Sequence, residues 1–124
     1  PTAVFLQQED LLGALDLLDE SRAEIVFSGA EYAYPIQRAV YINTNGRVSM
    51  FDPEHYSSRS QDLRKAYHDA GQFYLAKPEA ILNELSTFSE NSAVYVLPRY
   101  RVVDIDTEED WEVAERLFAI GKIT

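Results

Sequence analysis

The chain has 124 residues, enough for one domain with a hydrophobic core, and 46% are apolar, as expected of a globular protein. Its formal net charge of −10 argues against nucleic acid or an anionic membrane as a partner, because either would favour a basic face. The absence of cysteine excludes disulfides and thiolate catalysis and is compatible with the cytoplasm, and no apolar run of about 18 residues predicts a membrane span.

The chain opens with Pro1-Thr2-Ala3 and has no initiator methionine, so we expect it to be the inside of a longer protein. A helix is predicted over about Glu9–Ser21, because acidic residues at its start suit the helix dipole. Leucines recur at helical spacing and predict its apolar stripe: Leu11, Leu12, Leu15 and Leu18. A buried strand is predicted at Glu24–Ser28, ended by Gly29.

The next stretch, Glu31–Arg38, contains Pro35 and is interpreted as an edge strand or a loop. Apolar runs at 39–42 and 48–51 then flank Asn45-Gly46, which is a strong hairpin signal. This hairpin lies outside any alternation of strand and helix, and its apolar side chains need to be covered. We therefore predict a subunit interface at the hairpin.

Residues 59–67 are the most basic part of this acidic chain. Arg59, Arg64 and Lys65 are candidates to bind an anionic ligand, since the planar fork of arginine fits carboxylate or phosphate. The alternative is a charged surface turn. Gln37 and Arg38, which follow Pro35 closely, are open to the same two interpretations.

Further strands are predicted at 70–75, 92–97 and 99–105. In the first of these, Phe73 alternates with Tyr74, so that one face suits the core and the other a cleft wall. A short helix is predicted from Lys77, with apolar residues inside: Ile81, Leu82 and Leu85. A last helix is predicted by helical spacing and a terminal glycine: Trp111, Ala114, Leu117, Phe118 and Gly121.

Asp104 and Asp106 stand where the last predicted strand turns into the last helix, so in an extended backbone they project to one side. Ligands of open α/β sheets gather at such strand ends, and Mg²⁺ is usually held by one or two carboxylates with water and phosphate. The pair therefore predicts a magnesium–nucleotide site. Thr107 and Asp110 match a variant of the capping box. Because Asp-x-Asp is common by chance, the alternative that Asp106 caps the helix and Asp104 is solvated stays open.

Several islands of sequence, in order along nearly the whole chain, resemble one family when taken together. They are Pro1-Thr2-Ala3 with Phe5-Leu6-Gln7, Tyr34–Ala39, Arg59–Leu63, Asp69–Tyr74, Val103–Thr107, Asp110-Trp111 and Ala114-Glu115. The chain resembles the C-terminal part of the acylneuraminate cytidylyltransferases, the CMP–sialic acid synthetases, and within them the branch that activates pseudaminic acid.

The resemblance implies an α/β protein with a three-layer α/β/α nucleotide-diphospho-sugar transferase-like fold, a mixed sheet and a protruding β-hairpin. It implies Mg²⁺-dependent transfer of CMP from CTP to a nonulosonic (sialic- or pseudaminic-type) sugar acid, with Asp104 and Asp106 as catalytic metal ligands. It further implies one domain over 1–124 and a homodimer, with residues 39–67 as the inserted dimerisation segment. The residues implied in substrate binding are Gln37, Gln61 and Tyr74, with Arg38 and Arg59 as cations for the two anionic substrates.

The sequence departs from the family pattern in two places. The CTP-binding loop of the family belongs to the N-terminal half and is absent here, and Val4 stands where many relatives carry proline. We therefore expect an acceptor-and-metal half that has no turnover alone. Three alternatives remain: a non-catalytic dimerisation module of the same fold, another sugar nucleotidyltransferase, or a glycosyltransferase that uses the Asp-x-Asp pair.

Overall fold

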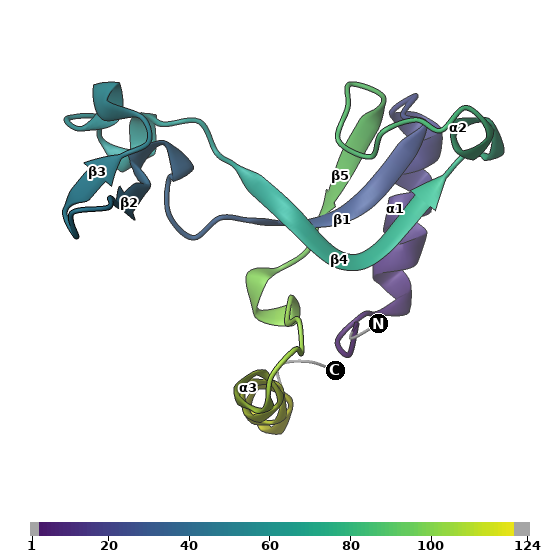
Figure 1. Ribbon diagram of the computed structural model, residues 1–124. Helices are drawn as coiled ribbons and strands as arrows, with labels where there is room; N and C mark the ends of the chain where they lie inside the picture. The colour runs from purple at the N-terminus through teal and green to yellow at the C-terminus, as the bar shows by residue number, and fades with distance from the viewer. Residues whose placement is uncertain (1–2, 121–124) are drawn as a thin grey trace. The chain divides into compact units, whose positions relative to one another are not determined.

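The computed structural model describes residues 3–120 and divides the chain into two compact units. Unit 1 comprises residues 1–30 and 69–124, and unit 2 comprises residues 31–68. Two strands, β1 (Ile25–Glu31) and β4 (Tyr67–Ala76), run through the boundaries between them. Figure 1 labels the helices and strands of both units.

Unit 1 is built on a three-stranded sheet in the order β4-β1-β5, with β5 at Ser92–Val96. β1 and β5 are parallel, with Ile25 opposite Ser92 and Gly29 opposite Val96. The arrows of β1 and β4 run in opposite directions, so the sheet is mixed, as predicted (Figure 1). Three helices accompany it: α1 (Gln8–Glu20), α2 (Pro78–Leu82) and α3 (Glu108–Ala119). The α/β class is therefore confirmed.

The core of unit 1 lies between α1 and the sheet. Its buried residues are Ala14, Leu18, Ala23, Val26 and Phe73. α1 lies against β5 and approaches it closely, because a Cβ at Gly13 would stand 2.8 Å from the ring of Tyr95. The absence of a side chain at this position is what lets the helix sit so near the strand.

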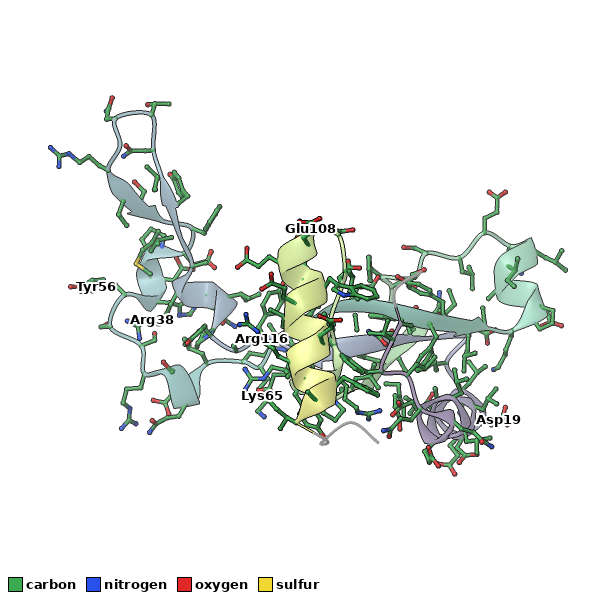
Figure 2. All side chains as sticks on the ribbon, turned by 90° about the horizontal axis from the view of Figure 1, so that it is seen from below. Asp19, Arg38, Tyr56, Lys65, Glu108 and Arg116 are labelled. Atoms are coloured by element: carbon green, nitrogen blue, oxygen red, sulfur yellow. The ribbon has the colours of Figure 1, made fainter. Side chains whose placement is uncertain are left out.

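This close approach explains why the predicted leucine stripe of α1 is only partly right. The buried positions are Asp10, Ala14 and Leu18, one helical turn apart, whereas Leu12 and Leu15 are 52% and 45% exposed. On the outer side of α1, Asp19 is exposed and projects from the helix into solvent (Figure 2).

β4 is irregular at Gly71, which has φ +64°. The buried hydroxyl oxygen of Ser28 in β1 accepts hydrogen bonds from the backbone N–H groups of Gln72 and Phe73, at 3.0 and 3.1 Å. A side chain thus satisfies two backbone donors where the strand bends. Beyond this point Phe73 is buried and Tyr74 exposed, as the alternation predicted.

Three predicted features of unit 1 are wrong. β1 continues through Gly29 to Glu31. The strand predicted at 99–105 is not formed: Arg99–Arg101 is a 3₁₀ turn (η4) in which the Arg101 N–H bonds to the Pro98 carbonyl at 2.9 Å, and residues 102–105 belong to no strand. In α2, Ile81 and Leu82 are 67% and 81% exposed and Ala80 is buried, because five residues make too short a helix for an apolar stripe.

Gly121, predicted to stop the last helix, lies outside the described residues, as do Pro1 and Thr2. Within residues 3–120, no helix combines the length and the apolar character needed to cross a membrane.

Unit 2 contains the predicted hairpin, formed by β2 (Val40–Ile42) and β3 (Val48–Met50). Ile42 pairs with Val48, and Gly46 has φ +70°, a conformation that suits glycine in such a turn. The remainder of the unit contains three 3₁₀ turns: η1 (Ile36–Arg38), η2 (Pro53–His55) and η3 (Ser60–Asp62). The hairpin is confirmed, and the stretch before it is a loop with a 3₁₀ turn rather than an edge strand.

Candidate functional site

The two predicted metal ligands lie on the segment between η4 and α3 in unit 1. Val103 and Ile105 pack against a small buried cluster of Phe5 and Ala114. Asp104 and Asp106, which alternate with them, are exposed. Although no strand forms here, the alternation of burial places both carboxylates on the solvent side of the segment.

Helix α3 begins at Glu108, which Figure 2 labels, and is capped by the residue before it. Thr107 is the N-cap: its hydroxyl accepts from the Asp110 N–H at 3.2 Å, and an Asp110 oxygen accepts from the Thr107 N–H at 2.9 Å. The predicted capping box is confirmed, and the alternative that Asp106 caps the helix is wrong. The Thr107 hydroxyl and then the N–H groups of Asp106 and Thr107 hold the pKa of the Asp110 carboxyl below its ordinary value.

The carboxylate pair fits a magnesium ion by the chemistry of its donors. Mg²⁺ takes hard oxygen ligands and usually keeps several waters, so that one or two protein carboxylates and a substrate phosphate suffice. Over residues 3–120, no group of three or more histidine, cysteine, aspartate or glutamate side chains offers an all-protein metal cage. The role of Asp104 and Asp106 as catalytic metal ligands stays a prediction.

A buried ion pair, which sequence reasoning missed, precedes this segment. Arg101 binds Asp10 of α1 through both ends of its guanidinium, Nη1 to Oδ2 and Nη2 to Oδ1, the latter at 2.9 Å. The residues are 3% and 9% exposed for Asp10 and Arg101. Hydrogen bonding to Asp10 raises the pKa of Arg101 above its ordinary value, and burial opposes this shift. The sequence assigned Asp10 to the helix dipole alone, since nothing local reveals a partner 91 positions away.

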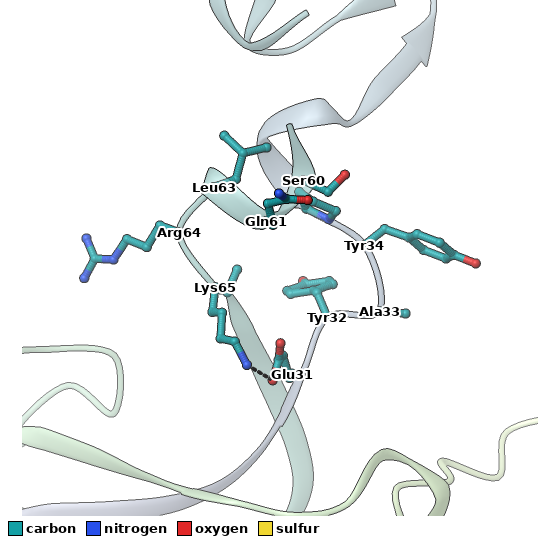
Figure 3. A pocket seen from close by; sticks show the side chains of 11 residues that line it. Glu31, Tyr32, Ala33, Tyr34, Ser60, Gln61, Leu63, Arg64 and Lys65 are labelled. Carbon is teal, nitrogen blue, oxygen red and sulfur yellow. Dashed lines mark hydrogen bonds and ion pairs between the residues drawn. The ribbon is translucent and has the colours of Figure 1, made fainter. Parts of the chain in front are cut away.

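Unit 2 contains a cavity of about 310 Å³ between residues 31–35 and 60–66 (Figure 3). The ring of Tyr32 and the side chain of Gln61 face each other across it, and the ion pair between Lys65 and Glu31, at 3.1 Å, lies at one end. The side chains of Arg64 and Tyr34 extend outward on opposite sides. The cavity therefore combines an aromatic wall, an amide and an ion pair, which suits a polar ligand.

Four of the residues predicted to bind substrate belong to unit 2. Gln61 lines this cavity, and Arg38 lines an adjoining hollow of about 480 Å³ that shares Tyr32, Tyr34, Pro35 and Ser60 with it. The amide nitrogen of Gln37 donates to the Arg64 carbonyl at 2.9 Å and so ties the two walls together. Arg59 lies outside both linings and pairs with Asp62 at 2.9 Å on the surface.

The fifth, Tyr74, belongs to unit 1. It is 52% exposed on β4, and its hydroxyl donates to a carboxylate oxygen of Asp69. Asp69 also accepts the Gly71 N–H at 2.8 Å, which places it in the irregular part of the strand. This hydrogen bond, with partial burial and the charge of Asp69, raises the pKa of Tyr74 above its ordinary value.

Comparison with known proteins gives relatives along most of the chain. It is 47% identical over 120 residues to pseudaminic acid cytidylyltransferase of Campylobacter jejuni, an alignment that covers 97% of this chain and 52% of the relative. It is 33% identical over 104 residues, 83% of this chain and 20% of the relative, to a Helicobacter pylori protein named pseudaminic acid cytidylyltransferase and UDP-2,4-diacetamido-2,4,6-trideoxy-beta-L-altropyranose hydrolase. A third relative, CMP-N,N'-diacetyllegionaminic acid synthase of Campylobacter jejuni, is 26% identical over 96 residues, 74% of this chain and 40% of the relative. No family model matches the chain.

These relatives define the class of protein to which the chain is related. The chain is homologous to cytidylyltransferases, which are nucleotidyltransferase enzymes. More particularly, its relatives at 47% identity are pseudaminic acid cytidylyltransferases, so the resemblance read from the sequence is confirmed. The chain spans about half the length of these relatives (52%).

Proposed function

We propose that the protein transfers CMP from CTP to a nonulosonic acid of the pseudaminic type and releases pyrophosphate. The observation that carries the proposal is the 47% identity to pseudaminic acid cytidylyltransferase over 97% of the chain. The exposed pair of Asp104 and Asp106 supports it, since phosphoryl-type transfer from a nucleotide needs charge neutralisation at the phosphates. We include in the proposal the three-layer nucleotide-diphospho-sugar transferase-like fold for the intact protein.

The proposed reaction needs no covalent intermediate with the protein. The anomeric hydroxyl of the sugar acid attacks the α-phosphorus of CTP in line, and pyrophosphate leaves. Asp104 and Asp106 would hold Mg²⁺, which would supply positive charge to neutralise the phosphates. The contribution of the chain is therefore positioning and electrostatics.

We propose that the cavity of unit 2 receives the sugar acid. Its volume of about 310 Å³ lies at the lower end of the usual range for small-molecule sites. Gln61 would hydrogen-bond the hydroxyl and amide substituents of the sugar, and Gln37 would keep the cavity walls in place.

Arg38, and Arg59 after its release from Asp62, would bind the negatively charged groups of the substrates. The Arg59–Asp62 pair is well exposed, and such surface pairs are worth only about 0–1 kcal/mol, so an anionic substrate could displace Asp62. Tyr74, whose side chain is exposed on β4, is proposed to bind substrate as well.

We also propose a homodimer, formed through the hairpin and its surroundings at residues 39–67. Five large apolar side chains within residues 40–51 are 44% to 76% exposed in the single chain: Val40, Tyr41, Ile42, Val48 and Phe51. Val40, Ile42 and Val48 share one face of the hairpin, and exposed apolar side chains gathered on one face are typical of a surface that another protein covers. The C2 symmetry that most dimers adopt would bury the same patch on both copies.

The proposed transfer is tested with Asp106→Asn in the intact protein. Loss of a ligand charge should lower the rate of CMP transfer by about 100-fold or more while the fold persists. This loss is larger than the usual loss of activity when a residue that only supports a metal ligand is changed. The matched control is Glu108→Gln, an exposed acid in the first turn of α3, which should keep activity. Formation of CMP-sugar from CTP at near-normal turnover by Asp106→Asn would refute the assigned role of the pair.

A second candidate function, a dimerisation module without catalysis, is favoured by the same exposed hairpin. Calorimetric titration of the intact protein with a CMP-sugar and Mg²⁺ separates the two. A non-catalytic module should show no binding that depends on Asp104 or Asp106, whereas the transferase should.

A further inference from the structure

The ion pair between Asp10 and Arg101 is the most deeply buried charge cluster among the described residues of unit 1. The Asp10 carboxylate accepts hydrogen bonds from both terminal guanidinium nitrogens of Arg101. Its Oδ2 also accepts a hydrogen bond from the backbone N–H of Gln7 at 3.0 Å. Such a bidentate contact fixes the orientation of the guanidinium as well as its distance. The pair therefore ties the first turn of α1 rigidly to η4.

Arg101 stands three positions before Asp104 and at the end of η4, whose turn is closed by the Val102 N–H bonding to the Arg99 carbonyl at 3.1 Å. At the other end of the segment, Thr107 and Asp110 fix the start of α3. Between them Val103 and Ile105 pack inward. The carboxylates of Asp104 and Asp106 thus sit on a short segment that is anchored at both ends and along its inner side.

Stability is a poor explanation for this buried pair. Taking two charges out of water costs about as much as their attraction returns, and apolar residues of the same volume often replace a buried pair without loss. What apolar residues do not reproduce is the direction that a bidentate contact imposes on the backbone that follows. We therefore expect the main effect of the pair to be on the direction of the backbone that follows Arg101, and not on stability.

We propose that Asp10 and Arg101 are positioning residues that set the arrangement of the Asp104 and Asp106 carboxylates for a divalent cation. This inference rests on the proposed function, because it assumes that the two carboxylates bind the metal. Neither Asp10 nor Arg101 touches the ion; they act through the backbone of residues 102–106.

The test measures binding of Mn²⁺ alone to the intact protein by electron paramagnetic resonance, without nucleotide or turnover. Arg101→Lys keeps the charge but loses the planar fork, so Mn²⁺ affinity should fall by about tenfold, as when residues that support metal ligands are changed. Arg116→Lys is the matched control, because Arg116 forms a single exposed contact with Glu112 on α3, at 3.2 Å. It should leave Mn²⁺ affinity unchanged.

Asp106→Asn in the same assay separates failure of this inference from failure of the proposed metal site. If Asp106→Asn leaves Mn²⁺ binding unchanged, the metal site itself is wrong and the inference falls with it. If Asp106→Asn abolishes binding while Arg101→Lys binds as tightly as the wild type, only the positioning role is overturned.

A double variant, Asp10→Asn with Arg101→Met, guards against a variant that fails to fold. It removes both charges at nearly constant volume, so its melting temperature should stay close to that of the wild type. Weakened Mn²⁺ binding well below the melting temperature, with faster amide hydrogen exchange at 102–106, would support the positioning role. A folded double variant with wild-type Mn²⁺ affinity would contradict it.

Discussion

At the scale of single residues, hydrogen bonds between polar side chains change how those side chains ionise. The Tyr74 hydroxyl donates a hydrogen bond to the Asp69 carboxylate, and because ionisation of Tyr74 would remove this donor, the hydrogen bond raises the pKa of Tyr74. A folded-state pKa above the ordinary value contributes stability fully below that ordinary value of 10.0 and loses it as pH rises through the folded pKa. The stabilising effect of this contact is therefore present at neutral pH and is lost in strongly alkaline solution.

Asp69→Asn should return the pKa of Tyr74 towards its ordinary value, because the largest cause of the shift is the hydrogen bond to the Asp69 carboxylate. The measurement is the absorbance of tyrosinate during a pH titration of Asp69→Asn against the wild type, with Tyr74→Phe to assign the signal. A titration of Tyr74 that is unchanged by Asp69→Asn would show that the contact is absent in solution.

At the scale of elements, local chemistry explains where helices begin better than it explains where strands run. α3 begins at Thr107 because the hydroxyl and the Asp110 carboxylate satisfy backbone donors reciprocally. The pKa of Asp110 is lowered in the folded state, so its stabilising effect is present above the unfolded pKa and is lost as pH falls through the folded pKa. The cap should accordingly weaken in acid.

Thr107→Ala should lower the free energy of unfolding by about 1 kcal/mol, the usual cost of removing an N-cap oxygen. Urea unfolding at neutral pH measures the loss, and the difference between variant and wild type should shrink in acid as Asp110 is protonated. Thr44→Ala, an exposed threonine in the hairpin turn, is the control and should change stability little. Equal effects of the two substitutions would argue against the capping box.

At the scale of the whole molecule, the exposed hairpin is the feature that the single chain leaves unexplained. Ile42 and Val48 form a cross-strand pair that is 76% and 69% exposed. An isolated two-stranded hairpin is marginally stable in water, so an apolar pair at this position implies a cover from elsewhere. The proposed homodimer supplies that cover.

Replacing both residues by threonine in the intact protein should shift the dimer towards monomer, because threonine keeps the strand preference and loses much of the apolar area. Sedimentation velocity over a range of concentrations measures the shift. Leu82→Gln changes an apolar residue that is 81% exposed on α2 and should leave the association unchanged. A wild-type protein that is monomeric at every concentration would contradict the dimer.

The sequence by itself determined the α/β class, α1, the hairpin around Gly46, β5 and the cap of α3, because each depends on neighbours within a few positions. It also indicated the family through islands that follow one another along the chain, and relatives at 47% identity confirm this resemblance. The seven site residues remain predictions of the same origin, since spacing and resemblance suggested them before any geometry was known.

The tertiary structure alone decided which face of α1 is buried, where the last predicted strand gives way to a 3₁₀ turn, and that Asp10 meets Arg101. Each of these depends on contacts between residues far apart in the chain, such as the approach of Gly13 to Tyr95. Local secondary-structure propensity is weak compared with such packing. A carboxylate at the start of a helix gives no indication, in the sequence, of an arginine partner far along the chain.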